Sequence, residues 1–193
     1  GRLTGAYDCF RTDDADFEMG SQLAMAESLM FDPAGCHRDM LKILERAADT
    51  GVQNPFDWPS LLAYTAFGAY FQQAPGVFEA AVTAAKRSMI RHSDFVVEIY
   101  APFFESLVAA RVYAETRGIV AIRYTEERHL AKKLSFRKHL DFGMDMARVL
   151  TSEGIGGGHP FSCSATTYDL ESVDRTIDLM VNAAEDYMSP QAA

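Results

Sequence analysis

The sequence has little cysteine and no long hydrophobic run. Its three cysteines, Cys9, Cys36 and Cys163, are scattered and form no Cys-x-x-Cys spacing, so neither a disulfide framework nor a cysteine zinc site is indicated. No stretch approaches the roughly 18 consecutive apolar residues that a membrane helix needs, and the first residues lack the basic and then apolar pattern of a secretory signal. These absences predict a cytoplasmic protein with no membrane partner.

Positive charge is also scarce. The chain carries 18 Lys and Arg against 27 Asp and Glu, a formal net charge of −9, which argues against a protein held on duplex nucleic acid chiefly by phosphate neutralisation. A nucleotide or short oligonucleotide met by a few local cations is compatible with this charge. The cations gather in one segment, at Lys132, Lys133, Arg137, Lys138 and His139. That cluster is either a functional patch or a solvated strand and turn.

The first part of the chain has a helical pattern. With 193 residues and 48% hydrophobic content, the chain is long enough for one ordinary domain or two small ones. Apolar positions recur at helical spacing over 16–30 and 39–48, and Asp57-Trp58-Pro59-Ser60 is typical of a helix start. We expect the Ala74-Pro75 pair to break the next helix, which would resume over 76–91.

Strand patterns appear in the second part. Segments 95–100 and 119–124 are β-branched and aromatic, and they flank a helical pattern over 103–116. Strand, helix, strand is the signature of a parallel crossover. The remaining expected elements are strands over 133–138 and 161–168 and helices over 141–151 and 171–187.

Together these patterns predict an α+β fold. We expect a helical N-terminal segment, 1–90, followed by a compact mixed β-sheet domain with flanking helices, 91–193. The change of pattern places the boundary near residues 88–94.

A glycine triplet is the most specific motif. Gly156-Gly157-Gly158-His159-Pro160 follows the expected helix 141–151. Adjacent glycines can take positive φ and turn successive N–H groups inward, which predicts a phosphate-binding loop. Arg137 could bind phosphate bidentately, and His159 could donate a hydrogen bond to it. The alternative is an ordinary turn in which His159 is structural.

Four landmarks in order suggest a family. They are the strand 96–102, Glu105-Ser106-Leu107, Ser135-Phe136-Arg137 and the Gly156–Pro160 motif. Residues 94–187 thereby resemble the substrate-binding domain attached to the Asp-His-His (DHH) phosphoesterases. That superfamily includes single-strand exonucleases, oligoribonucleases and cyclic-dinucleotide phosphodiesterases. Its small Ala-Ala-Gly continuation is replaced here by Phe161-Ser162-Cys163-Ser164-Ala165.

The resemblance implies a function. The chain would be the substrate-binding part of a phosphoesterase that hydrolyses phosphodiester bonds in short or cyclic nucleotides or in single-stranded nucleic acid. The alternative is a non-catalytic module that binds a nucleotide or a protein. Serines at such positions also commonly satisfy local backbone donors. The phosphate or nucleotide contacts that the resemblance implies are Ser106, Ser135, Arg137, Gly156, Gly157, Gly158 and His159.

The resemblance also implies two divalent ions, manganese or magnesium, in the full enzyme. This sequence contains no Asp-His-His triplet, so we expect no metal site and no cofactor in this chain, and we assign no catalytic residue. The catalytic lobe would lie on the same or another chain, with 1–90 as a linker or a remnant of that lobe. Asp13, Asp14 and Asp16 are either part of such a remnant or a helix N-terminus. A homo-oligomer is left open.

Overall fold

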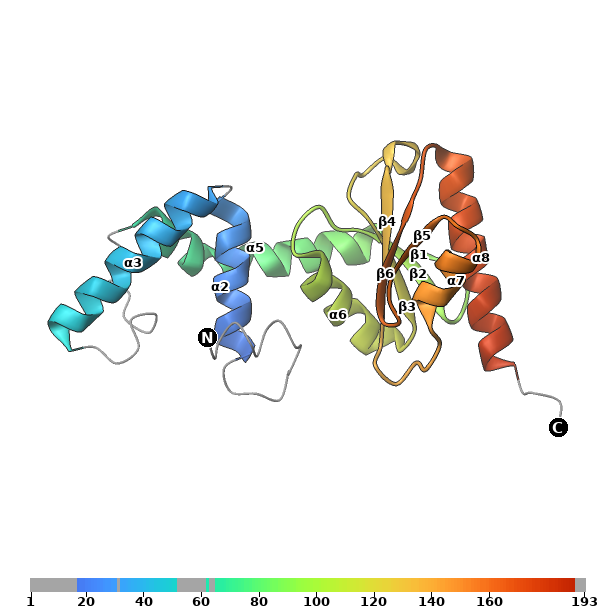
Figure 1. Cartoon of the computed structure of the whole chain (residues 1–193), viewed down its shortest axis with the longest axis horizontal. Coiled ribbons are helices and arrows are strands. Elements are labelled where there is room, and N and C mark those ends of the chain that lie inside the picture. Colours follow the sequence, from blue (N-terminus) through green and yellow to red (C-terminus); the bar gives the residue numbers. More distant parts are fainter. Residues whose placement is uncertain (1–16, 31, 52–61, 63–64, 190–193) are drawn as a thin grey trace. The chain divides into compact units, whose positions relative to one another are not determined.

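The computed structural model describes residues 17–30, 32–51, 62 and 65–189 (Figure 1). The chain forms two compact units, one ending at Glu79 and the other beginning at Ala80. The expected helix start at 57–60 and the aspartates at 13–16 lie outside the described residues. Within the described ranges, no helix is long and apolar enough to cross a membrane.

The helical unit contains α2 (Phe17–Met30), α3 (Pro33–Thr50) and the start of α5 (Ala66–Arg87). Helix α3 begins earlier than predicted because Asp32 accepts a hydrogen bond from the Gly35 N–H, with a proline in the first turn. The buried residues of this unit include Ala26, Cys36, Ile43, Leu62, Phe67 and Phe71.

The predicted break at Ala74-Pro75 is wrong, because α5 continues through Pro75 as one helix. A proline removes the hydrogen bond to the carbonyl four residues earlier, which here belongs to Phe71. That carbonyl instead accepts a hydrogen bond of 2.8 Å from Gln22 Nε2 on α2. A tertiary contact therefore satisfies the group that the proline leaves without its usual partner.

The second unit is built on a six-stranded sheet with the strand order β1-β2-β3-β4-β6-β5. Strands β2 and β3 are parallel, and the other neighbours are antiparallel. The strands are β1 (Ile90–Arg91), β2 (Val96–Tyr100), β3 (Ile119–Arg123), β4 (Lys133–Lys138), β5 (Gly156–His159) and β6 (Ser162–Thr166). The helices are α6 (Glu105–Thr116), the short 3₁₀ helix η2 (Arg128–Leu130), α7 (Met146–Ser152) and α8 (Leu170–Met188). The predicted α+β class and the parallel crossover β2-α6-β3 are confirmed.

The two faces of the sheet differ. Figure 1 shows α6 on one side and α7 and α8 on the other. The face toward α7 and α8 is apolar, with Leu134, Phe136, Cys163 and Ala165 in the main core. Because side chains alternate along a strand, the intervening residues of β4 and β6 project from the α6 side. These intervening residues are Ser135, Arg137, Ser162 and Ser164, so the α6 side becomes polar over β4 and β6.

The predicted glycine loop is instead the edge strand β5. It pairs antiparallel with β6, and Pro160 and Phe161 form the turn between them. A Cβ at Gly156 would lie 2.1 Å from Ser164 O, and one at Gly158 would lie 2.6 Å from Ser162 O. Within the triplet only Gly158 has a positive φ, 143°. Gly156 and Gly158 are therefore required for a close approach to β6, and the expected run of positive φ angles and inward N–H groups is wrong.

A buried carboxylate joins the strands to α8. Glu98 on β2 is fully buried, and its Oε1 accepts hydrogen bonds from Arg123 Nε at 3.1 Å and Arg128 Nε at 2.9 Å. Its Oε2 lies 3.0 Å from His92 Nε2. Arg128 continues to Asp174 Oδ1 on α8 at 2.6 Å. A buried charge is tolerated only when it is paired in this way.

We expect Glu98→Ala to lower the free energy of unfolding by about 3 kcal/mol or more, since Arg123 would keep its charge in the interior without its carboxylate partner. The matched control is Glu115→Ala, which breaks a solvent-exposed 2.7 Å ion pair with Lys86 and should cost less than about 1 kcal/mol. Urea unfolding followed by circular dichroism measures both. Equal losses in the two variants would contradict this account of the buried network.

Candidate functional site

Strand register brings two sequence-predicted residues, Arg137 and His159, into one row with Ser162 between them. Arg137 on β4 pairs with Ser162 on β6, and Ser162 pairs with His159 on β5. Directly paired residues of antiparallel strands project from the same face. In the next row, Ser135 pairs with Ser164, and Ser164 pairs with Gly157. The two rows form a polar face of the sheet, in which Ser135 is buried. We call it the serine-arginine face, and it consists of Ser135, Arg137, Ser162, Ser164, Gly157 and His159.

Arg137 is held at the border between this face and α6. Its Nη2 lies 3.2 Å from Glu105 Oε1 and 3.4 Å from Ser106 Oγ, and its Nη1 donates to its neighbour's carbonyl, Phe136 O, at 3.1 Å. The Arg137 side chain is 18% exposed. The structure therefore brings Arg137 and Ser106 together, and Glu105 fixes the direction of the guanidinium while leaving part of it accessible.

The first turn of α6 adds a second source of positive potential. Its N-cap, Phe104, is in the left-handed region with φ 55°, and no side chain caps the helix there. The N-terminus of a helix carries partial positive charge and N–H groups without an intrahelical partner. A non-glycine residue in that backbone region is strained, and such strain is often found at functional sites. Arg137 and this helix end together favour an anion, against which Glu105 competes.

Ser135 is the innermost predicted residue. It is 1% exposed, and its Oγ lies 2.7 Å from the Tyr124 hydroxyl. Burial, with a smaller contribution from the Glu105 carboxylate, raises the pKa of Tyr124 to about 12, so the phenol stays protonated at neutral pH. The sequence analysis did not single out Tyr124. The signal was a polar aromatic residue directly after a buried strand.

His159 lies at the exposed end of the β5–β6 hairpin. Its ring stacks on the ring of Phe161, with centroids 6.0 Å apart and planes at 15°. Gly158 directly precedes His159 in β5, and Gly156 and Gly157 come before Gly158. Alternate residues of an edge strand turn their N–H groups away from the sheet, so main-chain donors remain near the imidazole. This end of the hairpin can therefore offer both an imidazole and backbone amides to an anion.

The described residues do not fit the two-metal centre that the sequence resemblance implied. Among them, no group of three or more His, Cys, Asp or Glu side chains could hold a metal ion. His129 lies 3.2 Å from Glu127, and His139 lies 3.4 Å from Asp141. Each of these two histidines is paired with a neighbouring carboxylate in its own segment of the chain.

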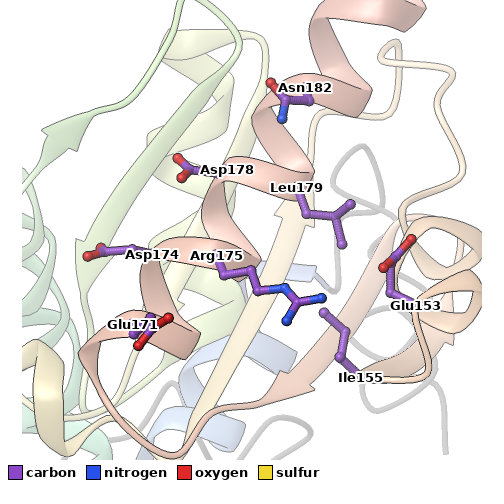
Figure 2. Close-up of a pocket in the computed structure, with 8 residues that line it drawn as sticks. All are labelled: Glu153, Ile155, Glu171, Asp174, Arg175, Asp178, Leu179 and Asn182. Atoms are coloured by element: carbon purple, nitrogen blue, oxygen red, sulfur yellow. The ribbon is translucent and has the colours of Figure 1, made fainter.

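A hollow of about 500 Å³ lies along α8 and differs in charge from the serine-arginine face. Figure 2 shows the side chains that line it, among them Glu171, Asp174 and Asp178 of α8 and Glu153. The single cation of the lining is Arg175. Because carboxylates outnumber the cation, this hollow disfavours a phosphate.

Comparison with known proteins identifies the fold. No family model and no curated protein matches the sequence. Among solved structures, the exonuclease RecJ bound to manganese matches with a TM-score of 0.57 and 14% identity, over 92% of this chain and 43% of RecJ. PggH, a pGpG-specific phosphodiesterase from Vibrio cholerae, matches with a TM-score of 0.52 and 12% identity, over 72% of this chain and 48% of PggH.

At 14% and 12% identity these likenesses show a fold that the chain shares with parts of RecJ and PggH. The chain spans less than half the length of either protein. What those whole proteins do is therefore relevant here only as the basis of a proposal.

Alanine substitutions at two neighbouring glycines of β5 should differ in their effect on stability. Gly158→Ala should lower the free energy of unfolding by about 1–3 kcal/mol, because its φ of 143° and the Ser162 carbonyl leave no room for a Cβ. At Gly157 the nearest atom to an added Cβ is Thr151 Oγ1 at 3.5 Å, an ordinary contact, so Gly157→Ala should stay within about 0.5 kcal/mol of wild type. Thermal unfolding compares the two, and a larger loss for Gly157→Ala would overturn the close-approach explanation.

Proposed function

We propose that the serine-arginine face binds a phosphate group of a nucleotide or of a short single-stranded oligonucleotide, as the substrate-binding part of a phosphoesterase. One observation carries this proposal. Arg137, held by the first turn of α6, stands in the same cross-strand row as Ser162 and His159. An arginine fork, serine hydroxyls and an imidazole are groups that bind phosphate oxygens.

The charge distribution supports this choice of face. Two other arginines of the region, Arg123 and Arg128, are bound to the buried Glu98, and Arg128 also pairs with Asp174, so carboxylates already neutralise their charge. Arg137 faces a single carboxylate, Glu105, in its ion pair. The terminal phosphate monoester of a nucleotide carries more negative charge than a carboxylate and can therefore compete for the guanidinium, whereas an internal phosphodiester carries a single charge.

The fold neighbours support the class of ligand. PggH is a phosphodiesterase specific for pGpG, and RecJ is an exonuclease. Both activities act on phosphodiester bonds of nucleotides. We carry over to this chain only the shared ligand chemistry, a phosphodiester in a short nucleotide.

In this proposal the chain binds the substrate and orients it for a reaction that occurs on another lobe. Holding the substrate in a fixed geometry lowers the barrier of a reaction whose attacking group is held elsewhere. The divalent ions of DHH-type phosphoesterases would polarise the phosphate on a separate catalytic lobe. The alternative is a module that binds the same ligand and takes no part in hydrolysis.

Binding of pGpG tests the face. We expect Arg137→Ala and His159→Ala each to weaken binding about tenfold, since each removes one charge-assisted or polar contact to phosphate. The control is Arg148→Ala, which removes an exposed cation from α7 on the opposite side of the sheet and should change the Kd less than twofold. Isothermal titration calorimetry measures all three. Equal affinity of the Arg137 and His159 variants with wild type would reject the proposed site.

A hydrolysis assay separates the two forms of the proposal. With manganese and pGpG, the chain alone should release product at the background rate, because the described residues gather no three metal ligands. Product formation above background would place catalytic groups within this chain. If a catalytic lobe supplied in trans restores turnover, the substrate-binding form is favoured over the non-catalytic module.

A further inference from the structure

The tip of the β5–β6 hairpin exposes an aromatic ring. Phe161 occupies the two-residue turn with Pro160 and is 53% exposed. Its ring lies nearly parallel to the His159 imidazole, with 15° between the planes. A single exposed aromatic residue is ordinary on a protein surface. Here the ring is paired with a residue of the serine-arginine face, which makes its exposure informative.

The ring is held in place before any ligand arrives. The turn is closed by the pairing of His159 with Ser162 on either side of it, and Pro160 has a fixed φ. Stacking on the imidazole restricts the remaining freedom of the phenyl ring. A preorganised aromatic ring loses little conformational entropy when a second flat group stacks on it.

The Phe161 ring is also close to the row of Arg137, Ser162 and His159 in the serine-arginine face. Phe161 precedes Ser162, and Ser162 is the direct partner of Arg137. One residue along the chain and one step between strands separate Phe161 from Arg137, a Cα distance of roughly 9 Å at most. A nucleotide held by its phosphate at Arg137 therefore has the hairpin tip within reach of its base.

Resting on the function proposed above, we propose that Phe161, backed by His159, is the stacking platform for the nucleobase of the bound nucleotide. The ring is uncharged and offers a π-face without hydrogen-bonding groups, so it accepts every base and favours the larger purines. The phosphate provides the charge-based part of the affinity, and the base provides the part that distinguishes a nucleotide from other organic phosphates.

Three ligands of graded structure test this on the full chain: AMP, UMP and ribose 5-phosphate. Wild type should bind AMP more tightly than UMP, and both more tightly than ribose 5-phosphate. Phe161→Ala should weaken AMP binding about tenfold and leave ribose 5-phosphate within twofold of wild type. Phe161→Trp, unlike Phe161→Ala, should keep the preference for AMP over ribose 5-phosphate, because the indole provides a larger π-face. Isothermal titration calorimetry measures each pair, with circular dichroism as the check on folding.

The matched control is Tyr168→Ala. Tyr168 is 84% exposed and follows β6 at the end opposite to Phe161, so its loss should change no ligand's Kd by more than twofold. Equal weakening of AMP and ribose 5-phosphate in Phe161→Ala would show that Phe161 only positions His159, and would overturn the platform. If the wild type bound ribose 5-phosphate as tightly as AMP, the stacking proposal would also be overturned, but the proposed phosphate site would not. If wild type bound none of the three ligands or pGpG, both proposals would fall together.

Discussion

The register between β4 and β6 is the constraint on which the site depends. Arg137 pairs with Ser162, and Phe136 pairs with Cys163 on the core side. Side chains alternate between the two faces with a period of two. A slip of one residue would therefore turn the Arg137 guanidinium toward α7 and α8 and turn the Phe136 ring away from the core. The free energy of the apolar core therefore fixes the position of the polar row. The glycines of β5 extend the same register to the edge, where His159 completes it.

The domain uses its arginines in two different ways. Arg123 is 5% exposed and joined to the buried Glu98, so its charge serves cohesion among β2, β3 and the neighbouring elements. Arg137 is partly exposed and forms an ion pair with Glu105, the first residue of α6. The pair with Glu105 orients the guanidinium and lowers the desolvation cost of holding it ready. In the proposed function, an incoming phosphate would exchange one anionic partner of Arg137 for another, so binding would require little rearrangement of the face.

The sequence predicted the elements better than their contacts. The strands over 95–100, 119–124 and 133–138 were predictable because β-branched runs and buried alternation are local signals. The course of α5 was not, since the partner of the Phe71 carbonyl is Gln22, almost fifty residues away. The glycine motif was predicted as a loop and is a strand, because its conformation depends on β6, which follows it in the chain. Glu98 and Tyr124 act through tertiary partners that no local pattern predicts.

Separation of recognition from hydrolysis is physically reasonable for such a fold. Binding energy gained at groups remote from the reacting bond can be used to orient that bond toward catalytic metals. In the proposed function, a face with one guanidinium, one imidazole and serine hydroxyls would bind phosphate without distinguishing its source. Discrimination then has to come from a neighbouring contact that only a nucleotide can make. In our proposal the ring of Phe161 makes this contact, because it lies next to the serine-arginine face and stacks on His159, which belongs to that face.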